Sequence, residues 1–414
     1  MRESIFRLSW MMLAVSMPLF GCEIGRLSIP PFHVPLPFVL LLIATVIHAL
    51  NFNRDGDNYY KVHSINLVPL NTLILLLFLW HLLSMFNTIN IGLAIKEVTK
   101  FAISIASFYI VFYLFPRNKK VIEMFWKIAL FSSSIILIYY LYYYLVVFKV
   151  GYLGIDITED SRSGRNQLAL YLAVIFPYVI AYSLFFKFKI ISSLVIIITI
   201  VSLIYVGSRA AWLAALLSVI IMSSLGGNRI INKRVKMIAF SLIMVGFSLW
   251  GLQIMTTMSN IESNVEYRYR FLDLVTGLKK DNYSNQVRKK LLKDSLERFT
   301  SSPIIGIGIR NTYSAEKFEG HNDWLLILTE MGAVGFLLFL GIMVWIMTQV
   351  CDDRNSDWWV IKGNQGTIVA IVVSLLFIYA YLLLYLWVIY AIILVSKEVD
   401  RSNKDNQRIT YICL

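Results

Sequence analysis

A single histidine stands out because of where it lies along the chain. Four of the five histidines lie within the first 81 residues, and His321 is alone in the rest. Asn322 or Asp323 can cap the helix that the next apolar run, 324–328, predicts. An imidazole at a helix N-terminus feels the positive end of the helix dipole, which disfavours its charged form. The position predicts a neutral His321 that can accept a proton, unless it is only a polar residue at a lipid interface.

Two arginines lie where a cation could hold an anionic group. Arg209 follows Gly207-Ser208 and opens the apolar run 210–225, and Arg288 lies on a predicted amphipathic helix at 285–300. A guanidinium group stays charged, and its planar fork fits the oxygens of phosphate. Two plainer interpretations stay open. Arg209 could reach toward lipid headgroups, and Arg288 could be one solvated base among several.

Three further cations are weaker candidates for contacts with a donor or an acceptor. Arg162 and Arg165 precede a predicted span, and Lys289 adjoins Arg288. All three are expected on the same outer side of the membrane as Arg209, so they could add to the same basic surface.

Other catalytic motifs are missing from the sequence. Gly306-Ile307-Gly308 is too short for a dinucleotide loop and follows no predicted strand. His321 has no evident nucleophile partner, and no acidic cluster indicates a metal site. The three cysteines lie far apart and offer no metal or disulfide spacing. We therefore expect no metal and no cofactor.

The composition sets where this chemistry takes place. Of the 414 residues, 58% are hydrophobic and 15% are charged, against roughly 45–50% and about 25% in soluble proteins. A water-soluble chain could not bury so much apolar surface. This excludes disorder, a nucleic-acid-binding domain and an ordinary cytosolic enzyme. The net charge of +13 then indicates cytoplasmic loops or contact with anionic lipid.

The apolar runs predict an all-α polytopic integral membrane protein with about twelve transmembrane helices, because a span needs about 20 residues. Ten spans are expected at 5–21, 36–52, 65–87, 98–115, 121–148, 166–186, 189–206, 209–225, 235–256 and 324–350. The run 366–396 is too long for one upright helix, so we interpret it as two short spans meeting near Tyr379–Tyr381.

Basic loops fix the expected orientation. With the N-terminus inside, every basic loop falls on the cytoplasmic side, as the positive-inside rule requires. These loops are 116–120, 187–189, 226–236 and the tail from 396. Both termini are then cytoplasmic. The segment Leu19–Cys22 also resembles a lipoprotein signal, but we expect a retained anchor because eleven more spans follow.

Four regions follow from this topology. They are helices 1–9 at 1–256, a periplasmic loop at 257–323, helices 10–12 at 324–396 and a cytoplasmic tail at 397–414. The large loop contains the amphipathic helix at 285–300, whose apolar side is expected to lie on the bilayer surface. Ser301-Ser302-Pro303 should end that helix.

Several of these residues together resemble the domain shared by O-antigen ligases and Wzy-type polysaccharide polymerases. That domain has a Ser-Arg-x-x-Trp span start, an Arg, a Pro-x-x-Gly-x-Gly turn and a His-Asn helix with Glu-x-Gly-x-x-Gly. The matching residues here are Ser208–Trp212, Arg288, Pro303–Gly308, His321-Asn322 and Glu330–Gly335. The likeness covers about 130 residues, from 205 to 335, and the flanks are similar only in hydropathy.

The resemblance implies a GT-C-like glycosyltransferase with about twelve spans, a periplasmic site and no metal. Carried over by position, the family's essential arginines fall at Arg209 and Arg288 and its histidine at His321. Lys289 and Lys290 crowd Arg288, which departs from the pattern and leaves open which cation contacts phosphate.

The implied reaction is metal-independent inverting transfer of a glycan from undecaprenyl pyrophosphate to a sugar hydroxyl, in the bacterial inner membrane. Expected partners are the lipid-linked oligosaccharide, the acceptor, the bilayer and a chain-length regulator, with no nucleic acid. A repeat-unit polymerase is favoured over a ligase that uses lipid A–core, because the flanking spans show no likeness to characterised ligases.

A flippase or transporter of the same lipid-linked sugar is the alternative of another class. Such proteins carry charged or helix-breaking residues in mid-span. Here Glu97, Lys100, Glu123 and Lys127 are expected near span ends, which argues against transport.

Overall fold

The fold is described from a computed structural model of the chain. It describes residues 10–17, 26–29, 32–35, 65–142, 162–185, 189–206, 208–224, 283–312, 322–351, 356, 358–377 and 382–412. Every structural statement below concerns these residues.

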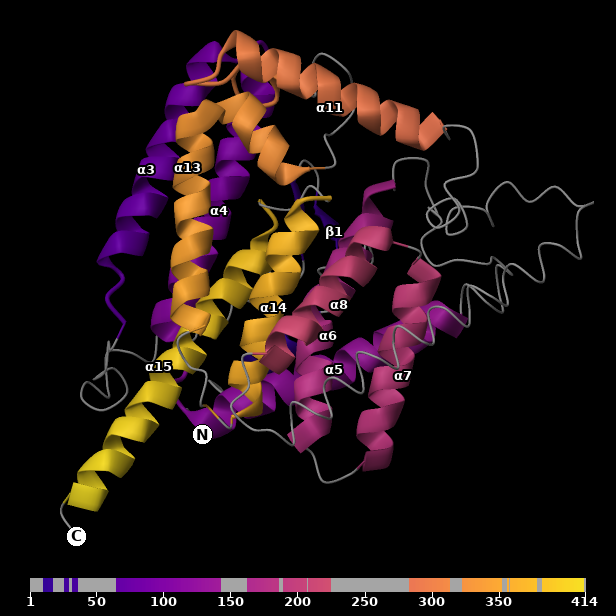
Figure 1. The fold of residues 1–414 in the computed structure, drawn as a ribbon, viewed down its shortest axis with the longest axis vertical. Coiled ribbons are helices and arrows are strands. Elements are labelled where there is room, and N and C mark those ends of the chain that lie inside the picture. Colours follow the sequence, from indigo (N-terminus) through magenta and orange to yellow (C-terminus); the bar gives the residue numbers. More distant parts are fainter. Residues whose placement is uncertain are drawn as a thin grey trace, which may run out of the picture.

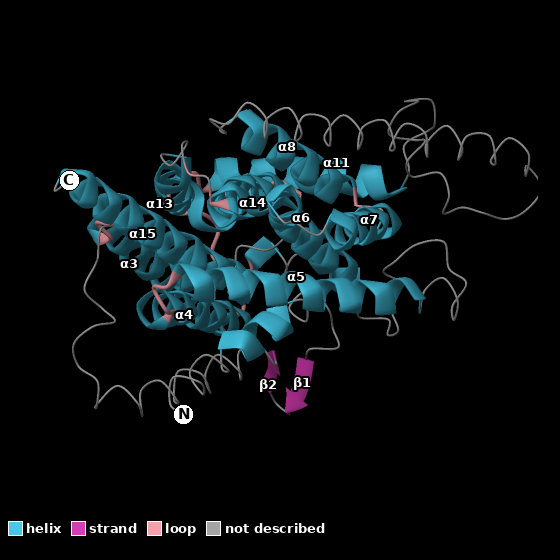
Figure 2. Ribbon diagram, turned by 90° about the horizontal axis from the view of Figure 1, so that it is seen from below, coloured by secondary structure: helices cyan, strands magenta, loops and turns pink. Residues whose placement is uncertain are grey.

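Helices make up most of the described chain, as the apolar runs predict (Figure 1). They are α3 (Val68–Ser84), the 3-10 turn η3 (Met85–Asn87), α4 (Ile91–Leu114), α5 (Lys119–Tyr142), α6 (Arg162–Phe185), α7 (Lys189–Val206), α8 (Arg209–Ser224), α11 (Tyr283–Ser301), α13 (Asp323–Cys351), α14 (Trp359–Leu375) and α15 (Leu384–Ile412). A short antiparallel hairpin, β1 (Arg26–Ile29) with β2 (Phe32–Pro35), departs from the all-α prediction. Figure 2 places it beside the helices, at the edge of the bundle.

Four stretches of helix are long and apolar enough to cross a membrane, within the described part of the chain. They are α3 with η3, α4, α5 and α13, and shorter apolar stretches lie in α6, α7, α8 and α14. These helices are therefore compatible with a polytopic membrane protein. The total of twelve spans remains a prediction. The predicted spans 36–52 and 235–256 lie outside the described residues.

The long apolar run near the C-terminus divides into two helices, as predicted. α14 ends at Leu375 and α15 begins at Leu384. Their outer bounds differ from the prediction, because α14 begins at Trp359, before the run, and α15 continues to Ile412. The residues predicted as a tail from 397 are thus largely helical.

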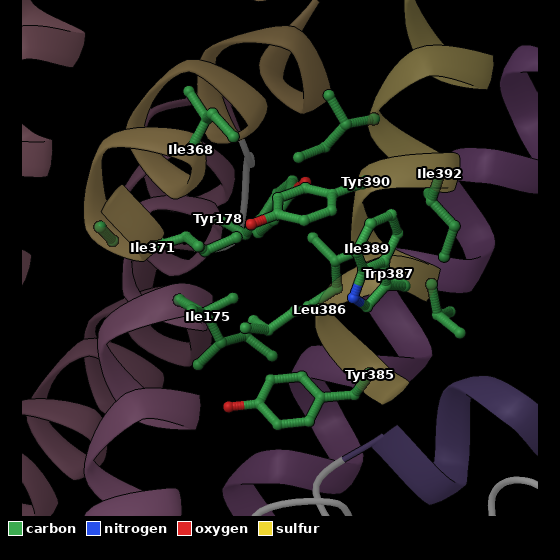
Figure 3. Packing of buried hydrophobic residues seen from close by; sticks show 14 of the residues in the cluster. Ile175, Tyr178, Ile368, Ile371, Tyr385, Leu386, Trp387, Ile389, Tyr390 and Ile392 are labelled. Atoms are coloured by element: carbon green, nitrogen blue, oxygen red, sulfur yellow. The ribbon is translucent and has the colours of Figure 1, made fainter. Parts of the chain in front are cut away.

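The core lies where α6, α8 and α14 pack together (Figure 1). Side chains of α6, α14 and α15 meet in this core (Figure 3). Gly363 lets α14 approach α6 closely, since a Cβ there would lie 2.2 Å from the ring of Tyr178. That ring stacks on Trp126, with centroids 3.7 Å apart, and its hydroxyl donates to Asn364 Oδ1 at 2.5 Å. The small residue and the fixed ring together set the α6–α14 distance, as in many helix pairs in membranes.

The outward faces of α3 and α4 carry large apolar side chains that no described residue covers. On α3 these include Leu75, Leu79 and Leu83, and on α4 they include Ile91 and Ile95. An apolar face of this extent is typical of helices that meet lipid.

Candidate active site

The most distinctive element of the candidate site is a break in α13. At Gly332 the backbone has φ 67° and ψ −172°, so α13 consists of two helical segments joined at a kink. A kink releases the carbonyls of the preceding turn from their helical partners, and in a membrane those carbonyls need new donors.

The loop after α11 supplies these donors. The N–H groups of Ile307 and Gly308 donate to the carbonyls of Thr329 and Glu330, both at 3.0 Å. In return, the N–H of Ala333 donates to the carbonyl of Pro303 at 2.9 Å. We call the docked pair of segments, 302–308 and 329–334, the glycine joint.

Side chains of α3 complete the glycine joint from the other side. The indole N–H of Trp80 donates to the carbonyl of Met331 at 2.8 Å, and the hydroxyl of Ser84 donates to the carbonyl of Glu330 at 3.1 Å. The broken turn of α13 is therefore held by two neighbouring elements, which makes the kink a fixed part of the fold.

Glycine is required at the centre of the joint for two reasons. Gly306 and Gly332 both have positive φ, at 75° and 67°, a region in which residues with a side chain are disfavoured. A Cβ on Gly306 would also lie 2.4 Å from the carbonyl of Glu330, and one on Gly332 would lie 2.2 Å from the oxygen of Ile304. The Pro-x-x-Gly-x-Gly and Glu-x-Gly motifs are thus the two halves of one backbone contact.

The loop continues from the joint to a second anchor on the turn between α3 and α4. The Asn311 amide donates to the carbonyl of Asn87 at 2.9 Å and accepts from the N–H of Ile89 at 2.8 Å. The Thr88 hydroxyl donates to the carbonyl of Ile309. These contacts hold residues 309–311 against the start of α4.

At the second anchor lies a group of charges, of which all but Lys100 are buried. Arg310 Nε is 3.1 Å from Glu97 Oε1, and the side chains are 11% and 1% exposed. The same oxygen lies 2.9 Å from Lys100 Nζ. Below the loop, the buried carboxylate of Glu330 faces the backbone N–H groups of Arg310 and Thr312. Each charge in this group therefore has an opposite charge or a hydrogen-bond donor beside it.

The location of Glu97 and Lys100 corrects the sequence analysis. They were expected near the end of a span that begins at 98, but α4 begins at Ile91 and both residues lie inside it. The physical reason is the ion pair with Arg310, which makes the buried charge of Glu97 tolerable within the apolar helix. An ionisable residue inside a span is itself a pointer to function.

Five of the predicted site cations lie in described helices, two of them as the first residue of their helix. Arg209 is the first residue of α8, Arg162 is the first of α6, and Arg165 lies in α6. Arg288 and Lys289 lie within α11, which has the predicted helical form. Their side chains lie outside what the structure describes, as does His321 altogether.

Contacts between helices nevertheless show how the elements that carry these residues lie relative to one another. Gly366 of α14 lies near Ser218 of α8, and the helices run in opposite directions, so Arg209 lies toward the Leu375 end of α14 (Figure 1). At that same end, the indole of Trp324 donates to the carbonyl of Val372 at 3.4 Å. The starts of α8 and α13 therefore lie at one end of the bundle.

Contacts of α11 and of the N-terminus of α13 extend this arrangement. The Thr329 hydroxyl donates to the carbonyl of Ser295 at 3.2 Å, which joins α11 to α13. Asn322, the residue after His321, caps α13 as expected by accepting from the N–H of Leu325 at 3.0 Å. The group of Glu97, Arg310 and Glu330 was not predicted, although Glu330 lies inside the predicted span 324–350, where a charge is a readable signal.

Comparison with known families assigns this region. Residues 194–340 match the family model described as O-antigen ligase. The match begins in α7, includes both halves of the glycine joint and ends in α13; Arg209, Arg288 and His321 lie within it, and Arg162, Arg165 and Glu97 lie outside it. No curated protein matches the chain.

Proposed function

We propose that this protein, whose residues 194–340 match the family model described as O-antigen ligase, transfers a glycan from undecaprenyl pyrophosphate to a sugar hydroxyl at the periplasmic face of the inner membrane. The observation that carries the proposal is the family match over the segments that hold Arg209, Arg288 and His321. The common location of the starts of α8 and α13 at one end of the bundle supports it.

In the proposed reaction, two arginines and one histidine divide the work. Arg209 and Arg288 hold the pyrophosphate and stabilise the negative charge that grows on it as it leaves. His321 takes the proton of the acceptor hydroxyl while that oxygen attacks the anomeric carbon. The new C–O bond forms as the bond from that carbon to the phosphate oxygen breaks, so the anomeric configuration inverts.

Two acceptors distinguish the two activities that share these parts. A repeat-unit polymerase extends another lipid-linked glycan, whereas a ligase uses lipid A–core. We favour the polymerase because the spans that flank residues 205–335 show no likeness to characterised ligases. The description of the matched family as O-antigen ligase keeps the ligase as the second candidate.

The test is glycan transfer by purified protein in the presence of EDTA. Lipid-linked repeat units serve as the donor, and the acceptor is either further donor or lipid A–core. We expect longer lipid-linked glycan with the first acceptor, and product on lipid A–core would identify a ligase instead. Absence of transfer to both acceptors would contradict the proposal, and a requirement for added metal would contradict the arginine clamp.

A further inference from the structure

Two buried ion pairs with nearly equal nitrogen–oxygen distances lie at opposite ends of α4. Near its start, Arg310 Nε lies 3.1 Å from Glu97 Oε1, with side chains 11% and 1% exposed. Just beyond its end, Arg117 Nε lies 3.0 Å from Glu398 Oε2, with side chains 10% and 1% exposed. Each pair also has further partners: Glu97 pairs with Lys100, and Arg117 donates to the carbonyls of Phe112 and Tyr113. The two pairs should therefore contribute to stability on a similar scale.

The pair at Arg310 differs from its counterpart in its backbone. Among the described residues, Arg310 is the one non-glycine residue with positive φ, at 63°. Such a backbone is unfavourable for a side chain as large as arginine, and it persists only where surrounding contacts impose it. Strained residues of this kind concentrate at functional sites.

The strained backbone lets one residue hold two helices. Its side chain pairs with Glu97 on α4, while its N–H faces the carboxylate of Glu330 on α13. Asn311 and Thr312 follow, one bonded to Asn87 and the other facing the same carboxylate. Arg310 therefore fixes the end of the loop relative to both α4 and the first segment of α13.

We propose that Arg310, held by Glu97 and Glu330, is a positioning residue for glycan transfer: it fixes the loop 302–312 against the first segment of α13. This inference rests on the proposed function, because that segment of α13 begins directly after His321. The three residues act through backbone placement and touch no substrate. A shift of about 1 Å in a catalytic group can cost on the order of 100-fold in rate, which is the size of effect that such a residue controls.

The counterpart pair supplies a matched control. Glu97→Gln and Glu398→Gln each remove one carboxylate charge and leave a buried arginine beside an amide of the same shape. Both variants should lower the thermal unfolding temperature by a similar amount. Only Glu97→Gln should lower kcat for glycan transfer, by about 10- to 100-fold, with the KM for the lipid-linked donor changed less than about threefold.

Lysine variants repeat the comparison with the charge preserved. Arg310→Lys keeps a cation beside Glu97 and should recover part of the kcat that Arg310→Ala loses, whereas Arg117→Lys and Arg117→Ala should both transfer at nearly the wild-type rate. This second series also decides the matter if Glu97→Gln does not fold.

The outcomes separate this inference from the proposed function. Wild-type rates in both Glu97→Gln and Arg310→Ala, or equal losses of kcat in the variants of the two pairs, would overturn the positioning role while leaving glycan transfer intact. An inactive wild-type protein would overturn the proposed function, and the positioning role with it.

Discussion

At the scale of single residues, the chemistry proposed for this protein depends on a few cations and one imidazole. Arg288 shares α11 with other basic residues, among them Lys293, whose side chain is 77% exposed and pairs with Glu297. A solvated lysine on the same helix is a suitable reference, because it tests whether charge alone matters.

Removal of the proposed base or of a clamp should lower the transfer rate far more than removal of that lysine. We expect His321→Ala and Arg288→Ala to lose about 10²–10⁴ in kcat, since general-base and charge-stabilising groups contribute that much. Lys293→Ala should stay within about threefold of the wild type. Initial rates with purified variants measure this, and full activity of His321→Ala would remove the proposed base.

Gly332 is the residue on which the glycine joint most directly depends. In Gly332→Ala, the positive φ alone should cost about 1–3 kcal/mol of unfolding free energy, and the new Cβ would meet the backbone of Ile304. Gly341→Ala, in the second segment of the same helix, meets only the side chain of Leu73 and should be neutral or slightly stabilising. Thermal unfolding in detergent compares the two, and equal stabilities would show that the joint tolerates a side chain.

At the scale of elements, the sequence was informative where apolar runs were long. The predicted span at 189–206 has the bounds of α7, and the span at 324–350 differs from α13 by one residue at each end. The kink in α13 could not be predicted, because an apolar run reads the same whether the helix is straight or broken. The hairpin at 26–35 was missed for a different reason: each strand has only 4 residues, too few for the alternation of polar and apolar residues to stand out.

For the candidate site, too, only some of the residues could be predicted from the sequence. Types and spacing drew attention to Arg209, Arg288 and His321, because chemistry limits which side chains can do this work. The ion pair of Glu97 with Arg310 joins residues more than 200 positions apart, and no local pattern links them. Only the packing of the loop on α4 brings the two side chains together.

Contact between α6 and α14 should be sensitive to added volume. In Gly363→Ala the new methyl group would lie 2.2 Å from the ring of Tyr178, which the stacked Trp126 prevents from moving away. We expect a loss of about 1–3 kcal/mol in unfolding free energy, typical of an overpacked core. Gly92→Ala, on the exposed first turn of α4, is the control and should be neutral or slightly stabilising. Unchanged thermal unfolding of Gly363→Ala would contradict this account of the interface.

At the scale of the whole molecule, the proposed orientation places α11 on the periplasmic side of the membrane and the turn before α5 on the cytoplasmic side. The first assignment follows the family's periplasmic site, and the second follows the basic residues at 116–120. Both surfaces offer exposed side chains, Lys293 on α11 and Lys120 at the start of α5.

Cysteine labelling tests this orientation directly. In a background without the three native cysteines, Lys293→Cys should react with a membrane-impermeant maleimide in intact spheroplasts. Lys120→Cys should react only after the membrane is permeabilised. The reverse pattern would place the catalytic residues in the cytoplasm and would rule out the proposed periplasmic reaction.

The broken helix also sets where the proposed base lies relative to the rest of the bundle. If α13 were straight, its first nine residues would continue the axis of the second segment by about 13 Å. Trp324 would then lie beyond the reach of Val372, and the capped end that follows His321 would project away from α14. The bend at Gly332 turns that end back over α14. In the proposed reaction, an acceptor sugar would therefore meet its base at the end of the bundle where α8, the helix that carries Arg209, also begins.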